Sequence, residues 1–441
     1  MPEAPIRLTL EDDLRRSRLT VFFRLLLVIP HVIWLALWGI AVFFAAIANW
    51  FATLFGGRSP EQLHDFIGTY IRYATHVSAY LLLAANPFPG FLGRPGTYPV
   101  DVVIDPSVRQ NRWKTGFRLI LVIPALVFSG VLFRSGAAFR QGRSGGGGGI
   151  AFGLAPLAAF LGWFAALITG RMPQGLRDAI VYGLRYGAQT HGYTLLLTDR
   201  YPSASPDLAP VPRLELDHPV HLVAEGDLRR SRLTVFFRLL LAIPHLIWVS
   251  LWGIAVFFAV IANWFATLFR GRSPEALHDF IATYIRYATH VFAYLWLTAN
   301  PFPGFVGKPG SYPVDLRIGA SERQNRWKTG FRLILVVPAV LVAGATGSLL
   351  SVAAVFGWFV SLFTAQMPRG FRDTGVYSLR YSAQTYAYLL LLTDRYPHAS
   401  PGLTQPVGPA PGPQPSPASA IGQPPPAPAP PPPEQPGPTP P

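Results

Sequence analysis

Long apolar segments dominate the chain, and they recur. The 42 residues of Leu14–Phe55 return at Leu228–Phe269 with five substitutions, at an offset of 214 residues (228 minus 14). Within the first copy, only three polar residues interrupt Leu25–Phe55. Apolar runs longer than about 18 residues are typical of membrane-spanning helices, because a helix that is apolar on every side leaves no face for water. The pattern therefore predicts a membrane protein that is built from repeats.

A fainter copy lies inside each half of the chain. The segment FFRLLLVIPH at Phe22–His31 returns as GFRLILVIPA at Gly116–Ala125 and as GFRLILVVPA at Gly330–Ala339. One unit of roughly 95 residues thus occurs four times, which indicates a tandem array. We expect the units at residues 1–97, 98–210, 211–311 and 312–400, with a proline-rich tail at 401–441.

Each unit begins with a short stretch in which apolar and polar residues alternate. The stretches start at Pro5, Tyr98, His218 and Tyr312. Alternation with a period of two is typical of β-strands of about five residues. Because isolated hairpins are only marginally stable in water, we expect the four strands to pair in one small sheet.

Three helices are expected after each strand. A first apolar helix contains a proline, a second apolar helix ends at a Trp-Phe pair, and a third is amphipathic. In unit two the polar, glycine-rich segment Arg134–Gly149 separates the apolar segments, and such a segment needs water. The expected fold class is an all-α integral membrane protein, with tandem repeats of an apolar helix hairpin plus an amphipathic helix and short β-strands at each repeat start.

The basic residues limit the number of membrane crossings. They follow the strand in every unit, and an odd number of crossings per unit would place alternate clusters on opposite sides, against the positive-inside bias. We favour a spanning hairpin of helices one and two, with helix three in the membrane plane and both termini cytoplasmic. In the alternative, helix one lies in the plane and the other two span. That arrangement puts four arginines near mid-membrane, at about 2.5–3.5 kcal/mol each.

Composition supports a membrane location and narrows the partners. Only 13% of the residues are charged, against about 25% in soluble domains. The net charge is +15, and the arginines flank apolar segments, which favours a lipid bilayer with anionic headgroups over nucleic acid. The chain has no cysteine, which excludes disulfides and thiolate metal sites. Its first residues lack the pattern of a signal peptide.

Charged residues recur on one face of the third helix. In every unit an aspartate is followed seven residues later by an arginine, two turns and about 10 Å along the helix axis. Because this distance is too long for a bond within the helix, we expect each aspartate to pair with an arginine of a neighbouring unit or with a basic cluster. The candidate structural or functional charges are Asp65, Arg72, Asp178, Arg185, Asp279, Arg286, Asp373 and Arg380.

No motif indicates catalysis. Histidine precedes aspartate at His64-Asp65 and His278-Asp279, but adjacent helical residues point about 100° apart and do not readily share a proton. The chain has no HExxH pattern and no His/Cys cluster. We therefore expect no catalytic residue, no cofactor and no metal site.

Five motifs stand out along the chain: RLLLVIPH at Arg24–His31, the run at Trp50–Arg58, the Asp-x6-Arg helix, LLLTDRYP at Leu195–Pro202 and the opening Tyr-Pro-Val strand. Together they resemble a bacterial integral-membrane family, the domain-of-unknown-function family 4389. The resemblance covers about Pro5–Pro397. It implies a membrane location and a repeated unit, and it brings no established activity.

Three classes of function fit these observations. A structural or interaction scaffold of the bacterial plasma membrane is favoured. A transporter or channel for a small or lipidic solute is the alternative, and it would need a polar path between units. A membrane enzyme comes third, since no convergent carboxylates are visible. The tail Pro401–Pro441 holds 19 of the 45 prolines and is expected to be disordered and open to a protein partner.

Overall fold

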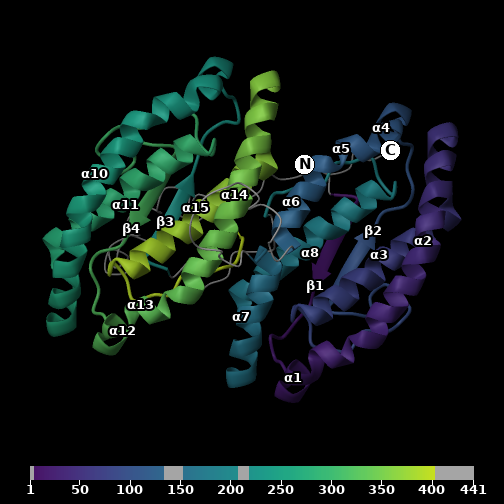
Figure 1. Ribbon diagram of the computed structural model, residues 1–441, viewed down its shortest axis with the longest axis horizontal. Coiled ribbons are helices and arrows are strands. Elements are labelled where there is room, and N and C mark those ends of the chain that lie inside the picture. The colour runs from purple at the N-terminus through teal and green to yellow at the C-terminus, as the bar shows by residue number, and fades with distance from the viewer. Residues whose placement is uncertain (1–3, 134–151, 207–217, 403–441) are drawn as a thin grey trace, which may run out of the picture. The chain divides into compact units, whose positions relative to one another are not determined.

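The computed structural model describes residues 4–133, 152–206 and 218–402, and within these ranges the chain is mostly helical (Figure 1). The insertion of unit two lies outside the described residues, and so does the proline-rich tail after residue 402. The described residues belong to one compact unit, Met1–Thr404.

The first half of the chain contains units one and two. Unit one consists of β1 (Ile6–Leu10), α1 (Arg18–Leu27), α2 (Ile29–Gly56) and α3 (Glu61–Leu81). Unit two consists of β2 (Val100–Ile104), α4 (Arg112–Gly116), α5 (Arg118–Leu121), α6 (Ile123–Phe133), α7 (Leu154–Thr169) and α8 (Gln174–Thr194).

The second half repeats this order in units three and four. Unit three consists of β3 (Val220–Ala224), α10 (Arg232–Arg270) and α11 (Glu275–Leu295). Unit four consists of β4 (Val314–Ile318), α12 (Arg326–Gly330), α13 (Arg332–Leu335), α14 (Val337–Thr364) and α15 (Arg369–Leu389).

The two apolar segments of a unit form one long helix, so the predicted hairpin is wrong for units one, three and four. α10 continues through Pro244, and α1 is separated from α2 only at Val28, which keeps a right-handed helical conformation. The turn of the hairpin was expected at the position of unit two's insertion, and α14 passes through the equivalent position without a break. Within the described residues, three helices are long and apolar enough to cross a membrane: Arg18–Gly56, Arg232–Arg270 and Arg332–Thr364.

Unit two carries its insertion in the middle of this long helix. α6 ends at Phe133, which is equivalent to Gly347 of α14 at an offset of 214 (347 minus 133). α7 begins at Leu154, which is equivalent to Leu349 at an offset of 195 (349 minus 154). The insertion therefore enters at the position of Ser348, where α14 is continuous.

The four strands form two separate sheets rather than the single sheet expected. β1 pairs with β2 in antiparallel orientation, with Leu8 opposite Val102. β3 pairs with β4 in the same register, with Leu222 opposite Leu316. Each sheet thus joins the two units of one half. In the part of the chain that the structure describes, each sheet has two strands, so each strand has one edge without a strand partner.

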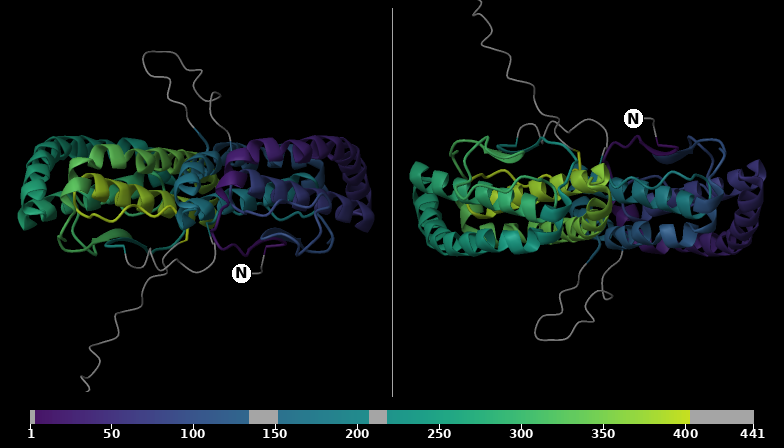
Figure 2. Two further views of the ribbon diagram at one scale, coloured as in Figure 1. Left: turned by 90° about the horizontal axis from the view of Figure 1, so that it is seen from below. Right: turned by 90° about the horizontal axis from the view of Figure 1, so that it is seen from above.

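The third helix of each unit packs between a long helix and a sheet. α3 runs antiparallel to α2, because His31 contacts Tyr73 whereas Asn49, later in α2, contacts Ser59 just before α3. On another side α3 contacts β2, and α8 contacts β1. Figure 2 shows the strands of each half on one side of its helices.

Candidate functional site

A fully buried arginine lies near the start of each long helix. The four are equivalent in the repeat and only 1–2% exposed: Arg24, Arg118, Arg238 and Arg332. Each guanidinium lies over a tyrosine ring at the end of the third helix, with its carbon 4.0–4.4 Å from the ring centroid. A cation over an aromatic face is attracted by the ring quadrupole, more strongly when water is excluded.

These arginines also bond the main chain where the third helix ends. Arg332 donates to the carbonyls of Tyr388 and Thr393, both at 2.8 Å. The last carbonyls of a helix lack partners within it, and a cation there also complements the helix dipole. We call this contact the arginine clamp. The other acceptors are Tyr80 and Ala85 for Arg24, Thr198 for Arg118, and Tyr294 and Ala299 for Arg238.

A buried leucine in a left-handed conformation follows the third helix of every unit. The φ angles are 61–66° at Leu83, Leu196, Leu297 and Leu391. This region is strained for residues other than glycine, so the surrounding packing must hold it. Each leucine carbonyl accepts a hydrogen bond from the side chain eight residues before the clamp arginine: Arg16, Gln110, Arg230 or Gln324.

Reciprocal hydrogen bonds join the two units of each half. Trp50, near the end of α2, donates to the carbonyl of Thr115 in unit two at 3.1 Å. Trp163, in α7, donates back to the carbonyl of Val21 in unit one at 3.1 Å. Trp264 and Trp358 make the same two bonds in the second half. The tryptophan of each Trp-Phe pair therefore connects the two units of its half.

A buried aspartate lies beneath each sheet. Asp101 of β2 bonds His76 at 2.8 Å and accepts hydrogen bonds from the main-chain N–H groups of Gly96 and Val102. Burial alone would raise the pKa of Asp101, but these hydrogen bonds outweigh it and hold the pKa below its ordinary value. Arg72, one of the predicted charges, lies 3.6 Å from Asp101 and donates to the carbonyl of Val102 at 3.0 Å.

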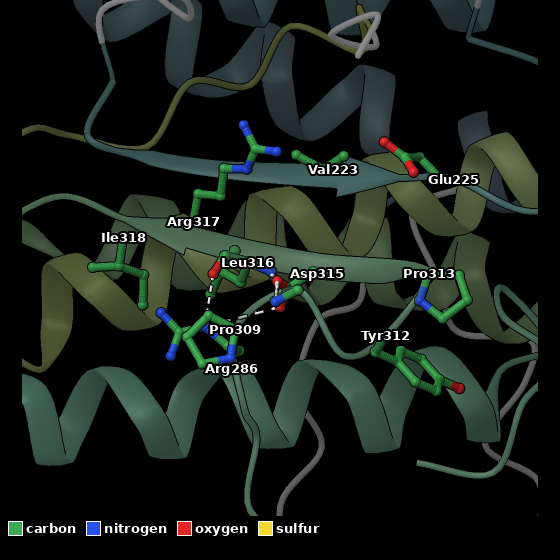
Figure 3. A pocket seen from close by; sticks show the side chains of 11 residues that line it. Val223, Glu225, Arg286, Pro309, Tyr312, Pro313, Asp315, Leu316, Arg317 and Ile318 are labelled. Carbon is green, nitrogen blue, oxygen red and sulfur yellow. Dashed lines mark hydrogen bonds and ion pairs between the residues drawn. The ribbon is translucent and has the colours of Figure 1, made fainter. Parts of the chain in front are cut away.

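Figure 3 shows Asp315 and Arg286, the equivalents of Asp101 and Arg72 in the second half. A pocket of about 350 Å³ lies beside β4, and Arg286 and Asp315 are among the residues that line it. Asp315 bonds His290 at 2.8 Å, and Arg286 donates to the carbonyl of Leu316 at 2.9 Å. Two charged groups of this pocket, Arg286 and Asp315, thus tie the sheet to α11.

The buried aspartates make the fold sensitive to acid. Because the pKa of folded Asp101 and Asp315 lies below the ordinary 3.8, their ionised forms stabilise the fold above about pH 4. This contribution is lost as the pH falls through the folded pKa. We expect Asp101→Asn to be less stable than the parent at neutral pH, with a smaller difference near pH 3. Thermal unfolding in detergent measures this, with the exposed Asp65→Asn as control. An equal deficit at both pH values would contradict it.

In units one and three the predicted arginines pair with the neighbouring unit, but the predicted aspartates do not. The side chains of Asp65 and Asp279 are 84% and 82% exposed, and each lies 3.4–3.5 Å from the histidine before it. The expectation that they meet arginines of another unit is therefore wrong. Both residues lie near the first turn of their helices, where the chain faces solvent. The arginines seven residues later, Arg72 and Arg286, bond the strands instead.

In units two and four the predicted charges meet across the two halves of the chain. Asp178 is buried against Arg177 at 2.7 Å and accepts a hydrogen bond from the hydroxyl of Ser400 at 3.0 Å. Arg380 donates to the main-chain carbonyl of the same Ser400. The aspartate of unit two and the arginine of unit four thus share one serine rather than a direct bond. The pseudo-equivalent set is Asp373, Arg372, Ser205 and Arg185.

Double-mutant cycles should reveal this sharing. We expect the stability losses of Asp178→Asn and Arg380→Gln to be non-additive by about 0.5–3 kcal/mol, because both hold Ser400. Asp178→Asn combined with Arg185→Gln serves as the matched control and should be additive. Denaturant unfolding in mixed micelles gives the four free energies. Coupling to Arg185 in place of Arg380 would contradict the assignment.

Among the residues that the structure describes, no group of three or more His, Asp or Glu side chains could hold a metal ion. The arrangement instead consists of repeated contacts that close each unit, join units in pairs and join the two halves.

These four equivalent units can be compared with known families. The family model described as "Domain of unknown function (DUF4389)" matches residues 18–92, 149–205, 232–306 and 326–400, which is more than half of the chain. The chain belongs to the DUF4389 family. No curated protein and no solved structure matched it. The DUF4389 match in unit two begins after Arg118, although the arginine clamp forms there as in the other units.

The clamp arginines were absent from the charges predicted from the sequence. Their signal is present nonetheless: an arginine recurs inside the apolar run of all four units, as in RLLLVIPH at Arg24–His31. A charge in such a run is expensive unless it is paired, so its recurrence indicates a buried acceptor. The acceptors could not be foreseen, because they are main-chain carbonyls with no side-chain signature.

Proposed function

We propose that this DUF4389 protein is a scaffold of the bacterial cytoplasmic membrane, with both termini cytoplasmic and a proline-rich tail that binds a protein partner. The supporting observation is that its buried charged side chains form contacts within the protein. The arginine clamps and the Asp178–Ser400–Arg380 contact join one part of the chain to another. Charged side chains that are engaged in such internal contacts stabilise one rigid body and do not form a site for chemistry.

The exposed surface of the long helices supports the membrane location. Leu25 and Phe55, near the two ends of the α1–α2 helix, are 73% and 72% exposed, and large apolar side chains between them are exposed as well. α10 repeats this surface. Soluble monomers rarely expose continuous apolar patches of this extent. The prediction of a multi-pass protein rested on a spanning hairpin in each unit. Because the apolar segments form one long helix instead, that argument no longer gives the number of membrane crossings.

The proposal can be tested with the full chain, a chain ending at residue 402, and a chain with a scrambled tail. We expect all three to remain in membranes after an alkaline carbonate wash. In-cell crosslinking should give one stoichiometric protein partner for the full chain and none for the shortened chain or the chain with the scrambled tail. Proteoliposomes should show no flux of ions or small solutes. A chain-dependent flux would favour the transporter instead, and loss from membranes at alkaline pH would refute the membrane location.

A further inference from the structure

The sheet of each half lies beside the middle of the long helices. Trp38, near the centre of the helix formed by α1 and α2, stacks on Tyr73 of α3 with ring centroids 5.6 Å apart. The neighbouring His76 bonds Asp101 of β2 at 2.8 Å. A bilayer crossed by this long helix would therefore surround the sheet with hydrocarbon. Open sheet edges exposed to lipid do not occur at that depth, because their backbone groups would lack partners.

The charge on the sheet and the length of the helix agree with this argument. Arg7 of β1 and Asp105, the residue after β2, form a partly exposed ion pair at 2.8 Å. The helix Arg18–Gly56 has 39 residues, or about 58 Å at 1.5 Å per residue. A bilayer core is only about 30 Å thick. A helix in the membrane plane has no such limit on its length.

The middle of α14 is not suited to the centre of a bilayer either. Its exposed positions there include Gly344 and Ser348 rather than large apolar side chains. The insertion of unit two enters at the position of Ser348, and its sequence contains Arg134, Arg140 and Arg143. In a spanning helix these arginines would begin at mid-membrane. A helix at the depth of the headgroups allows the insertion to reach water.

Arginines lie opposite each other in main-chain bridges, where the end of one unit's long helix meets the start of the other unit's helix in the same half. Arg58, after α2, is bridged to Arg109, before α4, in antiparallel orientation. Like charges directly opposite each other destabilise a strand pair. The carboxylate of Glu61 lies 3.4 Å from Arg58, but both side chains are exposed, so this ion pair offsets little of the repulsion. A phosphate accepts hydrogen bonds from two guanidinium groups and would relieve the repulsion. The other bridges are Arg15 with Arg171, Arg272 with Arg323, and Arg229 with Gln366.

Exposed tryptophans follow two of these arginine bridges. Trp113 and Trp327, at the starts of α4 and α12, are both 78% exposed. Tryptophan is enriched at the membrane–water interface, where its ring lies at headgroup level. Arginine and tryptophan at a helix end thus match an anionic lipid headgroup in charge and in depth.

We propose that the chain lies flat in one leaflet of an anionic bilayer. The long helices run parallel to the membrane plane with their apolar surface among the acyl chains. The sheets face water, and the paired arginines bind the phosphates of anionic lipids. This inference rests on the membrane location proposed above and adds the orientation and the lipid class.

Single cysteines report the orientation, since the natural chain has none. Ser17→Cys and Gly56→Cys lie at the two ends of the α1–α2 helix, and Val103→Cys lies on the sheet. In sealed vesicles we expect an impermeant thiol reagent to label all three from the same side. Ile40→Cys, in the exposed apolar surface of α2, should resist the reagent until detergent is added.

The outcomes separate this inference from the proposed function. Labelling of Ser17→Cys and Gly56→Cys from opposite sides would show a spanning helix, and would overturn the flat orientation while leaving the scaffold intact. Full labelling of Ile40→Cys without detergent would place that surface in water and would overturn both.

Lipid retention tests the arginine pairs. Nanodiscs of phosphatidylglycerol and phosphatidylcholine in equal amounts are dissolved, and the lipid bound to the full chain is measured by native mass spectrometry. We expect phosphatidylglycerol to be retained about tenfold more than phosphatidylcholine. The double variant Arg58→Gln/Arg109→Gln should lose much of this preference, whereas Arg94→Gln, in an exposed loop, should keep it. Equal retention of both lipids by the parent would refute the lipid class.

Discussion

Arg24→Ala is expected to lower the free energy of unfolding by roughly 3–5 kcal/mol. The side chain is buried and donates to two main-chain carbonyls, those of Tyr80 and Ala85. Each buried acceptor that loses its donor costs about 1–3 kcal/mol, and the truncated side chain leaves a cavity. Denaturant unfolding of the full chain in mixed micelles measures the loss.

Two further variants show whether the clamp is the cause. Arg270→Ala removes an exposed arginine at the end of α10 and should change stability by less than about 0.5 kcal/mol. Arg24→Lys keeps the charge but lacks the planar fork, so it should restore only part of the loss. Equal losses for Arg24→Ala and Arg270→Ala would contradict the clamp.

Gly175→Ala is expected to weaken the contact between the two halves. Gly175, at the start of α8, lies so close to unit four that an added Cβ would be 2.8 Å from the main-chain nitrogen of Ala399 and 3.0 Å from that of Ser400. Backbone cannot yield as a flexible side chain can, so we expect a loss of about 1–3 kcal/mol. Gly370→Ala should act in the same way, since its Cβ would meet Ala204 and Ser205 at 3.0 Å.

The matched control is a glycine with free space around it. Gly344, inside α14, has no atom within 4 Å of an added Cβ. Gly344→Ala should therefore raise stability by about 0.5–1 kcal/mol, because alanine loses less backbone entropy in a helix. The two substitutions are chemically identical and should differ in sign. A gain for Gly175→Ala would show that the halves do not approach each other at this point.

The repeat and the apolar helices could be predicted from the sequence, because both are local patterns. The segment Leu14–Phe55 is nearly identical to Leu228–Phe269, and three long apolar helices follow the predicted apolar segments. The hairpin was wrong because the glycine-rich segment Arg134–Gly149 of unit two was taken to mark a turn in every unit, whereas α14 is continuous at the equivalent position.

The candidate site could be predicted only in part, because its contacts lie between distant segments. The spacing of Asp178 and Arg185 correctly excluded a bond within one helix. The sequence could not show that Asp178 accepts a hydrogen bond from Ser400 or that Arg185 donates one to the carbonyl of Ser205. Exposure of Asp65 at the same repeat position was equally hidden, since identical spacing meets water in unit one and protein in unit two.

The central claim is that contacts between the four units hold them together as one body. Cleavage of the chain between the two halves tests this claim most directly. A protease site placed within residues 207–217 of the full chain allows the purified protein to be cut in mild detergent. We predict that the two halves continue to elute as one 1:1 complex and that Gly175→Ala combined with Gly370→Ala weakens it. Separation of the unmodified halves after cleavage would contradict the claim.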